Sequence, residues 1–533
     1  MSTFHRKRAT ASPSVSTAPT PRRRSAPRFA ILHVLAMAGV LAFAASDARA
    51  LSATWISTSS SDWSVGTNWS GAVAPGSVTN LSTDTARFRG ASCQLTVLPD
   101  ANRSVGYVEF DQVAPGNAGN YILGAVDGHA LHMGRTDGAG HFQVGGGLTT
   151  PDTTTTIICP LVLHGSYQFI NNSLEPTVAL VLASDISNGS AGNTDVQLKG
   201  LSTGYNRVSG TIREGAATAS LTKLNPGTWY VTGTNNTYTK NTTVSQGTLI
   251  AGANVPASGP GPFGDSSAAV FVGNPTRFAV GDATLLVGDG TNGFTMARPI
   301  TIQALTTGMA QTVGIGGANT AGVSYVTGNL SLNRDVFLQC ATGGTVVFQT
   351  GTWTTRDKVF TIGREDCLGC VKIANDLGTA GGVTVAYGTL EVAGTITAPT
   401  SVNDGATLSG TGTIVGNVVL ADNATCAPGT NGAGTLAVDG AATFQPGSRF
   451  AVNVGSNGTA SKLTASDAIS LDDVVLDVTS PEGFAGTVVI AHADTALTGT
   501  FSASSPLPPF CSIVYTANEA KLRFTTGTLI AIQ

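Results

Sequence analysis

The chain has 533 residues, of which 66 are glycine, 11% are charged and 41% are hydrophobic. Glycine and asparagine favour turns, valine and threonine favour strands, and the residues that build long helices are scarce, so the composition predicts an all-β protein. Residues 1–50 hold 8 of the 28 basic and 1 of the 32 acidic residues, which leaves 20 and 31 and a net charge of −11 beyond them. This acidity argues against nucleic acid and anionic membranes as partners.

The first 50 residues have the pattern of an export signal. Basic residues precede an apolar segment, 29–45, and the small-residue pattern A-x-A follows at Ala48, Arg49 and Ala50. This order is typical of a signal peptide of the Sec type, with a twin-arginine signal or an uncleaved membrane anchor as the alternatives. No other stretch is long and apolar enough to cross a bilayer. We therefore expect a secreted or outer-surface protein with no transmembrane span in the mature chain.

A tryptophan-rich segment, residues 51–84, follows this leader and carries Trp55, Trp63 and Trp69. The first coil of a stacked repeat has no neighbour on its outer side, so large aromatic side chains there are expected to cap the open core. The alternative is that the three rings stack on sugars and form a carbohydrate-binding platform.

The strongest pattern lies between residues 388 and 450, where apolar residues recur every six positions. Ten of the eleven positions in this register are apolar, and similar triplets begin at residues 388, 406, 424 and 442. Six is a multiple of the two-residue period of a strand, and three six-residue sides make an 18-residue coil. Each strand is then expected to pair in parallel with its equivalent one coil away.

Equivalent residues of successive coils are expected to stack in columns. One interior column should hold Leu390, Leu408, Cys426 and Phe444. In that position Cys426 is a buried hydrophobe rather than a reactive thiol. A second interior column should hold Val402, Leu420 and Val438. A neighbouring column that faces the other way should hold Thr389, Thr407, Thr425 and Thr443.

These columns predict a single-stranded parallel β-helix, or β-solenoid, over residues 85–480. The cap at 51–84 precedes it, and a strand-rich cap at 481–533 follows it. A strict six-residue period suits coils of either hand, so the period alone leaves the handedness open.

One candidate for chemistry is the CxxC pair of Cys367 and Cys370. No second pair stands at zinc-finger spacing, so a local disulfide in a loop is expected. The neighbouring Arg364, Glu365 and Asp366 are interpreted as a loop tip.

Histidines and carboxylates are the other candidates. His129 and His132 fall on opposite faces of an extended segment, which argues against a shared metal ion, and His141 is interpreted as another surface histidine. The cluster of Asp472, Asp473 and Asp477, with the last two on one strand face, is interpreted as a solvated surface. We therefore expect no catalytic, cofactor-binding or metal site, and no cofactor.

Residues 224–252 resemble the autotransporter-associated β-strand repeat, with Trp229 and Lys240 as departures. The matching residues include Gly233, Asn236, Thr237, Tyr238, Gly247, Thr248 and Leu249. Segments 63–88 and 400–438 resemble the opening and closing coils of such passengers. The family implies a right-handed β-helix at the cell surface or outside the cell. Family members end in an outer-membrane barrel, whereas nothing near Gln533 has the alternation of barrel strands, so we expect a passenger without the barrel.

The expected function is therefore non-enzymatic, with a structural or adhesive role outside the cell. An extracellular carbohydrate-binding module and a β-helix enzyme that cleaves polysaccharides are the alternatives. The expected partners are extracellular polysaccharides or components of the cell surface.

Overall fold

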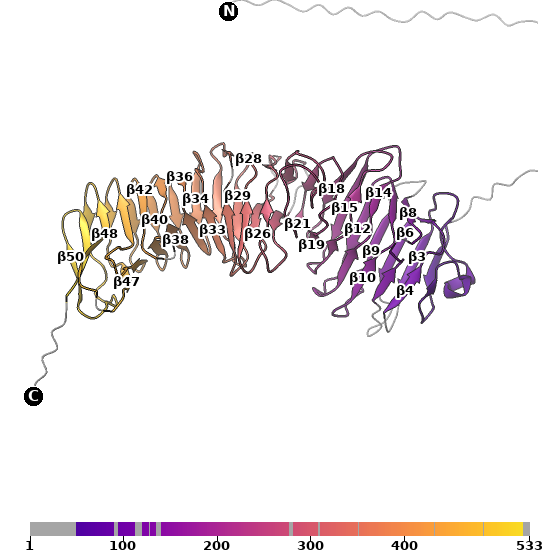
Figure 1. Cartoon of the computed structure of the whole chain (residues 1–533), viewed down its shortest axis with the longest axis horizontal. Coiled ribbons are helices and arrows are strands. Elements are labelled where there is room, and N and C mark those ends of the chain that lie inside the picture. The colour runs from indigo at the N-terminus through magenta and orange to yellow at the C-terminus, as the bar shows by residue number, and fades with distance from the viewer. Residues whose placement is uncertain are drawn as a thin grey trace, which may run out of the picture. The chain divides into compact units, whose positions relative to one another are not determined.

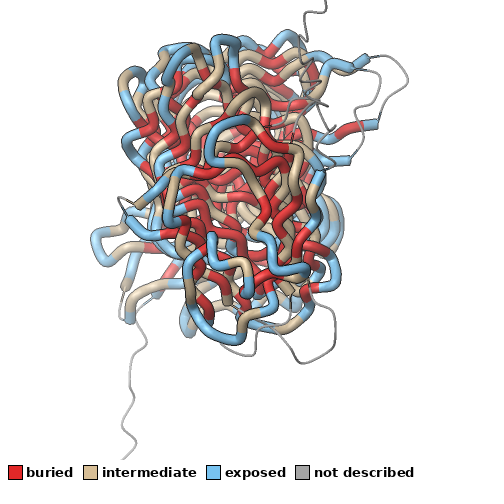
Figure 2. Tube along the Cα trace, turned by 90° about the vertical axis from the view of Figure 1, so that its right-hand side faces the viewer, coloured by how far each residue is buried: buried red, intermediate tan, exposed pale blue. Residues whose placement is uncertain are grey.

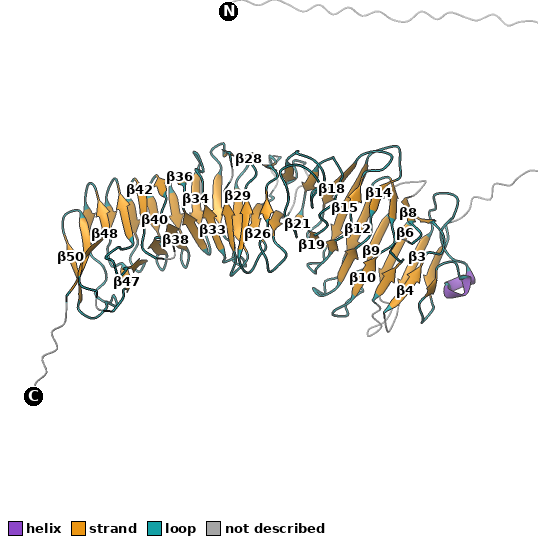
Figure 3. Ribbon diagram, in the orientation of Figure 1, coloured by secondary structure: helices purple, strands orange, loops and turns teal. Residues whose placement is uncertain are grey.

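The computed structural model describes residues 50–525, with gaps at 90–93, 112–119, 127, 135–139, 277–280, 307–309, 350, 431 and 483. The expected signal peptide lies almost entirely outside the described residues. Within them, the helical elements are two short 3-10 turns, Gly66–Asn68 and Ser70–Ala72, and the other regular elements are strands (Figure 3).

The strands recur in a fixed order around each coil, as in β3 (Thr85–Arg89), β4 (Leu95–Leu98) and β5 (Arg103–Val105). Figure 1 shows equivalent strands of successive coils side by side, as in β6 (Tyr107–Asp111), β9 (His141–Val144) and β12 (Tyr167–Asn171). We call the three positions side 1, side 2 and side 3. Side 2 is one sheet from β2 (Ser61–Asp62) to β49 (Leu497–Thr498). Among the described residues, its end strands β2 and β49 each pair with a single strand, β4 and β46 (Ile469–Ser470), so the sheet is an open row of strands.

Sides 1 and 3 each consist of two successive sheets. On side 1 they run from β1 (Ser52–Trp55) to β31 (Trp353–Thr354) and from β36 (Thr395–Thr397) to β48 (Gly486–Ala493). On side 3 the first sheet runs from β5 to β17 (Ile212–Arg213). The strands of the second sheet are β24 (Thr295–Met296), β27 (Val323–Val326), β30 (Thr345–Phe348), β33 (Cys370–Ile373), β35 (Thr389–Val392), β38 (Thr407–Gly410), β41 (Thr425–Pro428), β44 (Arg449–Asn453) and β47 (Val475–Thr479).

Strands of neighbouring coils pair in parallel, which confirms the predicted parallel β-solenoid. Leu390 of β35 lies opposite Leu408 of β38, and Leu408 lies opposite Cys426 of β41. All three side chains are buried, and Thr389 and Thr407 beside them face the other way and are partly exposed. Buried and less buried residues alternate along the strands, as the two-residue period requires (Figure 2).

The predicted columns break after Cys426, which lies opposite Phe450 rather than Phe444. Phe444 instead follows Leu420 on side 2, and Val438 follows Ile414 on side 1.

The physical reason is a longer coil. An 18-residue coil leads from Thr407 to its partner Thr425, whereas a 24-residue coil leads from Thr425 to its partner Arg449. The six-residue extension preserves the alternation of inward and outward side chains, yet it moves each later position to the next side of the coil. Thr443 therefore leaves the threonine column and pairs with Val419.

Coil length varies along the whole stack. A 17-residue coil leads from Val383 to its partner Thr400, whereas a 36-residue coil leads from Gly247 to its partner Ala283. The additional residues form loops at the corners, where they leave the paired strands in register.

The two ends of the ladder differ. At the first, β1 pairs in parallel with β3. At the last, β48 pairs in parallel with β45 (Lys462–Ala465) and in antiparallel fashion with β51 (Glu519–Phe524), whose other neighbour is β50 (Cys511–Tyr515). The parallel ladder thus extends beyond residue 480, and an antiparallel hairpin follows it.

Candidate functional site

The CxxC residues do not form the expected disulfide. Cys367 and Cys370 are both free, and burial raises the pKa of each thiol to about 11, so both remain protonated near neutral pH. The expected loop tip is present, since Glu365 and Asp366 form an exposed turn between Arg364 and Cys367, but Arg364 at its base has partners. Its Nη2 lies 2.7 Å from Oδ2 of Asp282, and its guanidinium covers the ring of Phe337.

The three histidines considered in the sequence lie in three different surroundings in the fold. His129 is exposed, and Nε2 of His141 lies 3.5 Å from Oε1 of Glu109. Nδ1 of His132 lies 3.0 Å from Nε2 of His164 on the adjacent coil, and the two rings stack at 5.2 Å beside a pocket of about 210 Å³. Burial lowers the pKa of both imidazoles. Sequence reasoning missed His164, because a whole coil of irregular length separates the two histidines and hides their contact.

The three tryptophans are buried rather than displayed. Trp55, Trp63 and Trp69 are each at most 2% exposed, and all three rings pack against Phe88. The indole nitrogen of Trp69 donates a hydrogen bond to the backbone oxygen of Trp63. A sugar cannot stack on rings that are covered in this way, so the alternative of a tryptophan platform is wrong.

The aspartates are solvated, but not as one strand surface. Asp472 and Asp473 occupy an exposed turn before β47, with Asp473 at φ +53°. Asp477 lies within β47 and pairs with Arg449 at 2.6 Å. The expectation that Asp473 and Asp477 share a strand face is therefore wrong, because the strand begins after Asp473.

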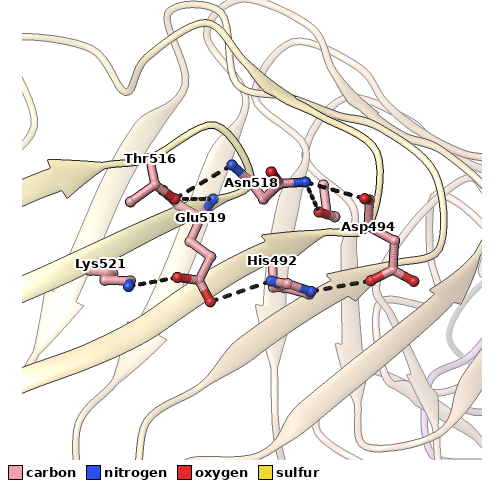
Figure 4. A network of polar contacts seen from close by, with 7 residues as sticks. His492, Asp494, Thr516, Asn518, Glu519 and Lys521 are labelled. Carbon is pink, nitrogen blue, oxygen red and sulfur yellow. Dashed lines mark hydrogen bonds and ion pairs between the residues drawn. The ribbon is translucent and has the colours of Figure 1, made fainter.

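A polar network at the C-terminal hairpin has an acid–histidine–acid order (Figure 4). Nε2 of His492 lies 3.1 Å from Asp494, Nδ1 lies 3.4 Å from Glu519, and Lys521 pairs with Glu519 at 2.6 Å. His492 and Glu519 are direct partners across β48 and β51. The network thus joins the hairpin to the last coils, since its members bond to one another and to backbone groups.

A groove runs over the outer surface of side 3, and we call it the side-3 groove. Two columns of outward side chains cross its strands. The first column holds Val323, Thr345, Cys370, Thr389, Thr407 and Thr425. The second holds Tyr325, Val347, Lys372, Glu391, Ser409 and Ala427. Alternation turns their neighbours, such as Val346, Val371 and Leu390, into the core.

Two adjoining hollows of about 640 and 360 Å³ form the groove. Tyr325, Gln349 and Lys372 line the larger one, and Ser409 and Asn453 line the smaller one. Both hollows include Glu391 and Thr430 in their walls, so they are neighbours along the stack.

Thr430 borders both hollows, and Gly429 borders the smaller one, at the point where the 24-residue coil gains its length. Gly429 exchanges two backbone hydrogen bonds with Gly410, at 3.1 and 2.8 Å. The hydroxyl of Thr430 then donates a hydrogen bond of 2.9 Å to Oε1 of Glu391, which stands 39 residues earlier. The longer coil therefore supplies a wall that an 18-residue coil has no residues to build.

The lining mixes polar and apolar side chains, and its charge is balanced. Nζ of Lys372 lies 2.6 Å from Oε1 of Glu391, and the two side chains are 27% and 15% exposed. These two are the charged residues among those that line the hollows, so their charges cancel. Tyr325 presents an aromatic ring with 38% of its surface exposed. The sequence did not reveal this grouping, because several coils of irregular length separate Tyr325 from Glu391.

Among the described residues, no three His, Cys, Asp or Glu side chains are placed to hold a metal ion. The same part of the chain contains no helix long and apolar enough to cross a membrane.

The fold and the groove together define the class of protein as a parallel β-solenoid with a groove along one side. No protein-family model matches the chain, and no curated protein matches it.

Proposed function

We propose that this chain is an exported, non-enzymatic β-solenoid that serves a structural and adhesive role at the cell surface or outside the cell. The observation that carries the proposal is the continuous parallel sheet of side 2, from β2 to β49. Backbone hydrogen bonds hold its coils in register, so outward side chains stand in fixed columns over many coils. Such a surface suits repeated weak contacts with an extended partner.

The leader pattern and the family resemblance support the cellular setting. Residues 1–50 have the basic, apolar and small-residue order of an export signal, and residues 224–252 resemble a passenger repeat of autotransporters. We propose that the mature chain is a passenger-like solenoid with right-handed coils.

Cell fractionation with the full chain tests the export step. We expect the wild type in the outer-surface or medium fraction without residues 1–50. Replacing both small residues, as Ala48→Trp and Ala50→Trp, should leave the leader attached, because signal cleavage requires small side chains there. Arg49→Lys is the matched control, since it preserves the A-x-A pattern. A wild-type chain found intact in the cytoplasm would contradict export.

Adhesion and the absence of enzymatic activity, the two other elements of the proposed function, need separate measurements. Cells that display the full chain should attach to surfaces better than cells without it. Incubation of the purified protein with a panel of polysaccharides should release no products. Sustained release of reducing ends would overturn the non-enzymatic assignment, and unchanged attachment would overturn the adhesive one.

A further inference from the structure

We propose that the side-3 groove binds a neutral polysaccharide, which lies across successive coils. This inference rests on the proposed function, because it names the ligand class of the adhesive surface. It concerns the surface between Tyr325 and Asn453, which the sequence did not single out.

The strands beneath the groove limit how it can hold a ligand. β27, β30, β33, β35, β38, β41 and β44 each pair with a strand on both sides. Their backbone groups are therefore engaged, and an extended peptide cannot bind by adding a strand. Recognition must come from side chains, and those at hand are hydroxyls, amides, an ion pair and one aromatic ring, among small and aliphatic side chains such as Val323 and Val347.

The charge of the groove favours a neutral ligand. Lys372 and Glu391 neutralise each other at 2.6 Å, and both retain partial exposure in the groove. A paired ammonium and carboxylate can donate to and accept from hydroxyl groups without favouring a charged ligand. An acidic polymer would meet Glu391 without a surplus of cations to offset it.

The shape of the groove suits an extended ligand. The hollows adjoin along the stack and share Glu391 and Thr430, so one extended ligand can occupy both. Their floor includes small side chains, Ser409 and Ala427, which leave room above the sheet. Tyr325 stands in the larger hollow, where its ring can pack against the apolar face of a sugar while its hydroxyl meets water. The arrangement fits a chain of sugar units better than a compact ligand.

Binding to immobilised polysaccharides tests the proposal with the full mature chain. The neutral probes are β-glucan, xylan, mannan and dextran, and the acidic probes are alginate and polygalacturonate. We expect at least one neutral polymer to bind and both acidic ones to bind more weakly. Failure of every neutral polymer, or binding of the acidic ones alone, would overturn the proposal, as would binding of denatured protein or peptide in preference to the polysaccharides.

Tyr325→Ala locates the site. We expect it to weaken the neutral interaction about tenfold, through loss of the aromatic contact. Tyr387→Ala is the matched control, because Tyr387 is similarly exposed, at 42%, but does not line either hollow. Thermal melting of both variants verifies that they fold. Equal affinity of the two folded variants would refute the assignment to this groove.

Glu391→Gln tests the charge argument. The change leaves Lys372 without its anionic partner, so alginate should gain salt-dependent affinity while the shape of the groove is retained. Peptide-level maleimide labelling adds a local readout, since a bound polymer should slow the reaction of Cys370 but not that of Cys511 in the hairpin. No gain of alginate binding, or equal protection of both thiols, would count against the inference.

These outcomes separate this inference from the proposed function. If cells attach through the chain and Tyr325→Ala attaches equally well, the groove proposal fails and the adhesive function stands. If the purified chain binds a neutral polymer but remains in the cytoplasm of cells, the proposed function fails and the groove proposal stands.

Discussion

Deletion of residues 429–434 should shorten one coil without disturbing the stack. The 24-residue coil would return to the length of its 18-residue neighbours, and Leu436 and Val438 would still face the core, because six is an even number of strand positions. The deletion removes two backbone bonds to Gly410 and the bond from Thr430 to Glu391. At about 1 kcal/mol for each net hydrogen bond, the local cost is about 3 kcal/mol.

Deletion of only residues 429–433 should be far more damaging. Removing an odd number of residues exchanges the inward and outward faces of the strand that follows. This exchange would expose Leu436 and Val438 and turn Asp439 toward the core. Exposure of two apolar side chains costs about 1.5–3 kcal/mol each, and burial of an unpaired carboxylate adds several kcal/mol more.

Hydrogen–deuterium exchange followed by mass spectrometry measures this difference coil by coil. It suits a stacked repeat, whose coils can open locally rather than all together. We expect the six-residue deletion to retain protection in β42 (Thr435–Asp439) and the five-residue deletion to lose it. Equal protection in the two deletions would refute the reasoning from strand parity.

Three buried or partly buried groups of titratable side chains should affect the stability of the protein. Lys223 is fully buried, its Nζ donates to three backbone oxygens at 2.6–3.1 Å, and burial lowers its pKa to about 7. Lys223→Ala should lower the free energy of unfolding by about 3–5 kcal/mol, measured by denaturant titration, because three acceptors lose their donor. His132 and His164 have pKa values below the 6.5 of the unfolded chain, so their contribution to folding stability is intact above pH 6.5 and is lost as the pH falls below it. His132→Asn should therefore reduce the fall of the urea midpoint below pH 6.5. The contact with His141, whose Nε2 lies 3.5 Å from Oε1 of Glu109, is the main cause that lowers the pKa of Glu109 to about 2. About 1–2 kcal/mol of stability should therefore be present above pH 4.5 and lost as the pH falls toward 2, and Glu109→Gln should abolish this loss in the same titration.

The fold was predictable where the repeat is regular, because the 18-residue coil there is a whole multiple of the six-residue apolar period. Leu390, Leu408 and Cys426 occupy the predicted column, since two consecutive 18-residue coils separate them. The same period could not place Phe444 or Val438 correctly. A six-residue insertion leaves the six-residue period unchanged and alters only the side on which each position falls.

The candidate site was less accessible from the sequence. Its residues come together through pairing between coils, as His132 meets His164 and Lys372 meets Glu391. The longest coils are about twice the length of the shortest and conceal these contacts, because no fixed spacing connects the partners. The tryptophans posed a different problem, since a cap and a sugar platform require the same residue type. Burial of the rings decided between them, and burial is a property of the fold.

The exclusive pairing of each coil with its immediate neighbours also determines how the protein should respond to force. Tension applied to the ends of the chain loads the terminal coil first, and its release leaves the next coil as the new terminus. Extension should then proceed in unequal steps, each set by the length of one coil. The aromatic cluster around Phe88 and the hairpin of β50 and β51 are the elements that resist the first step at either end. A chain built in this way can lose one or a few terminal coils under load and pair them again when the load is removed, rather than unfold as a whole.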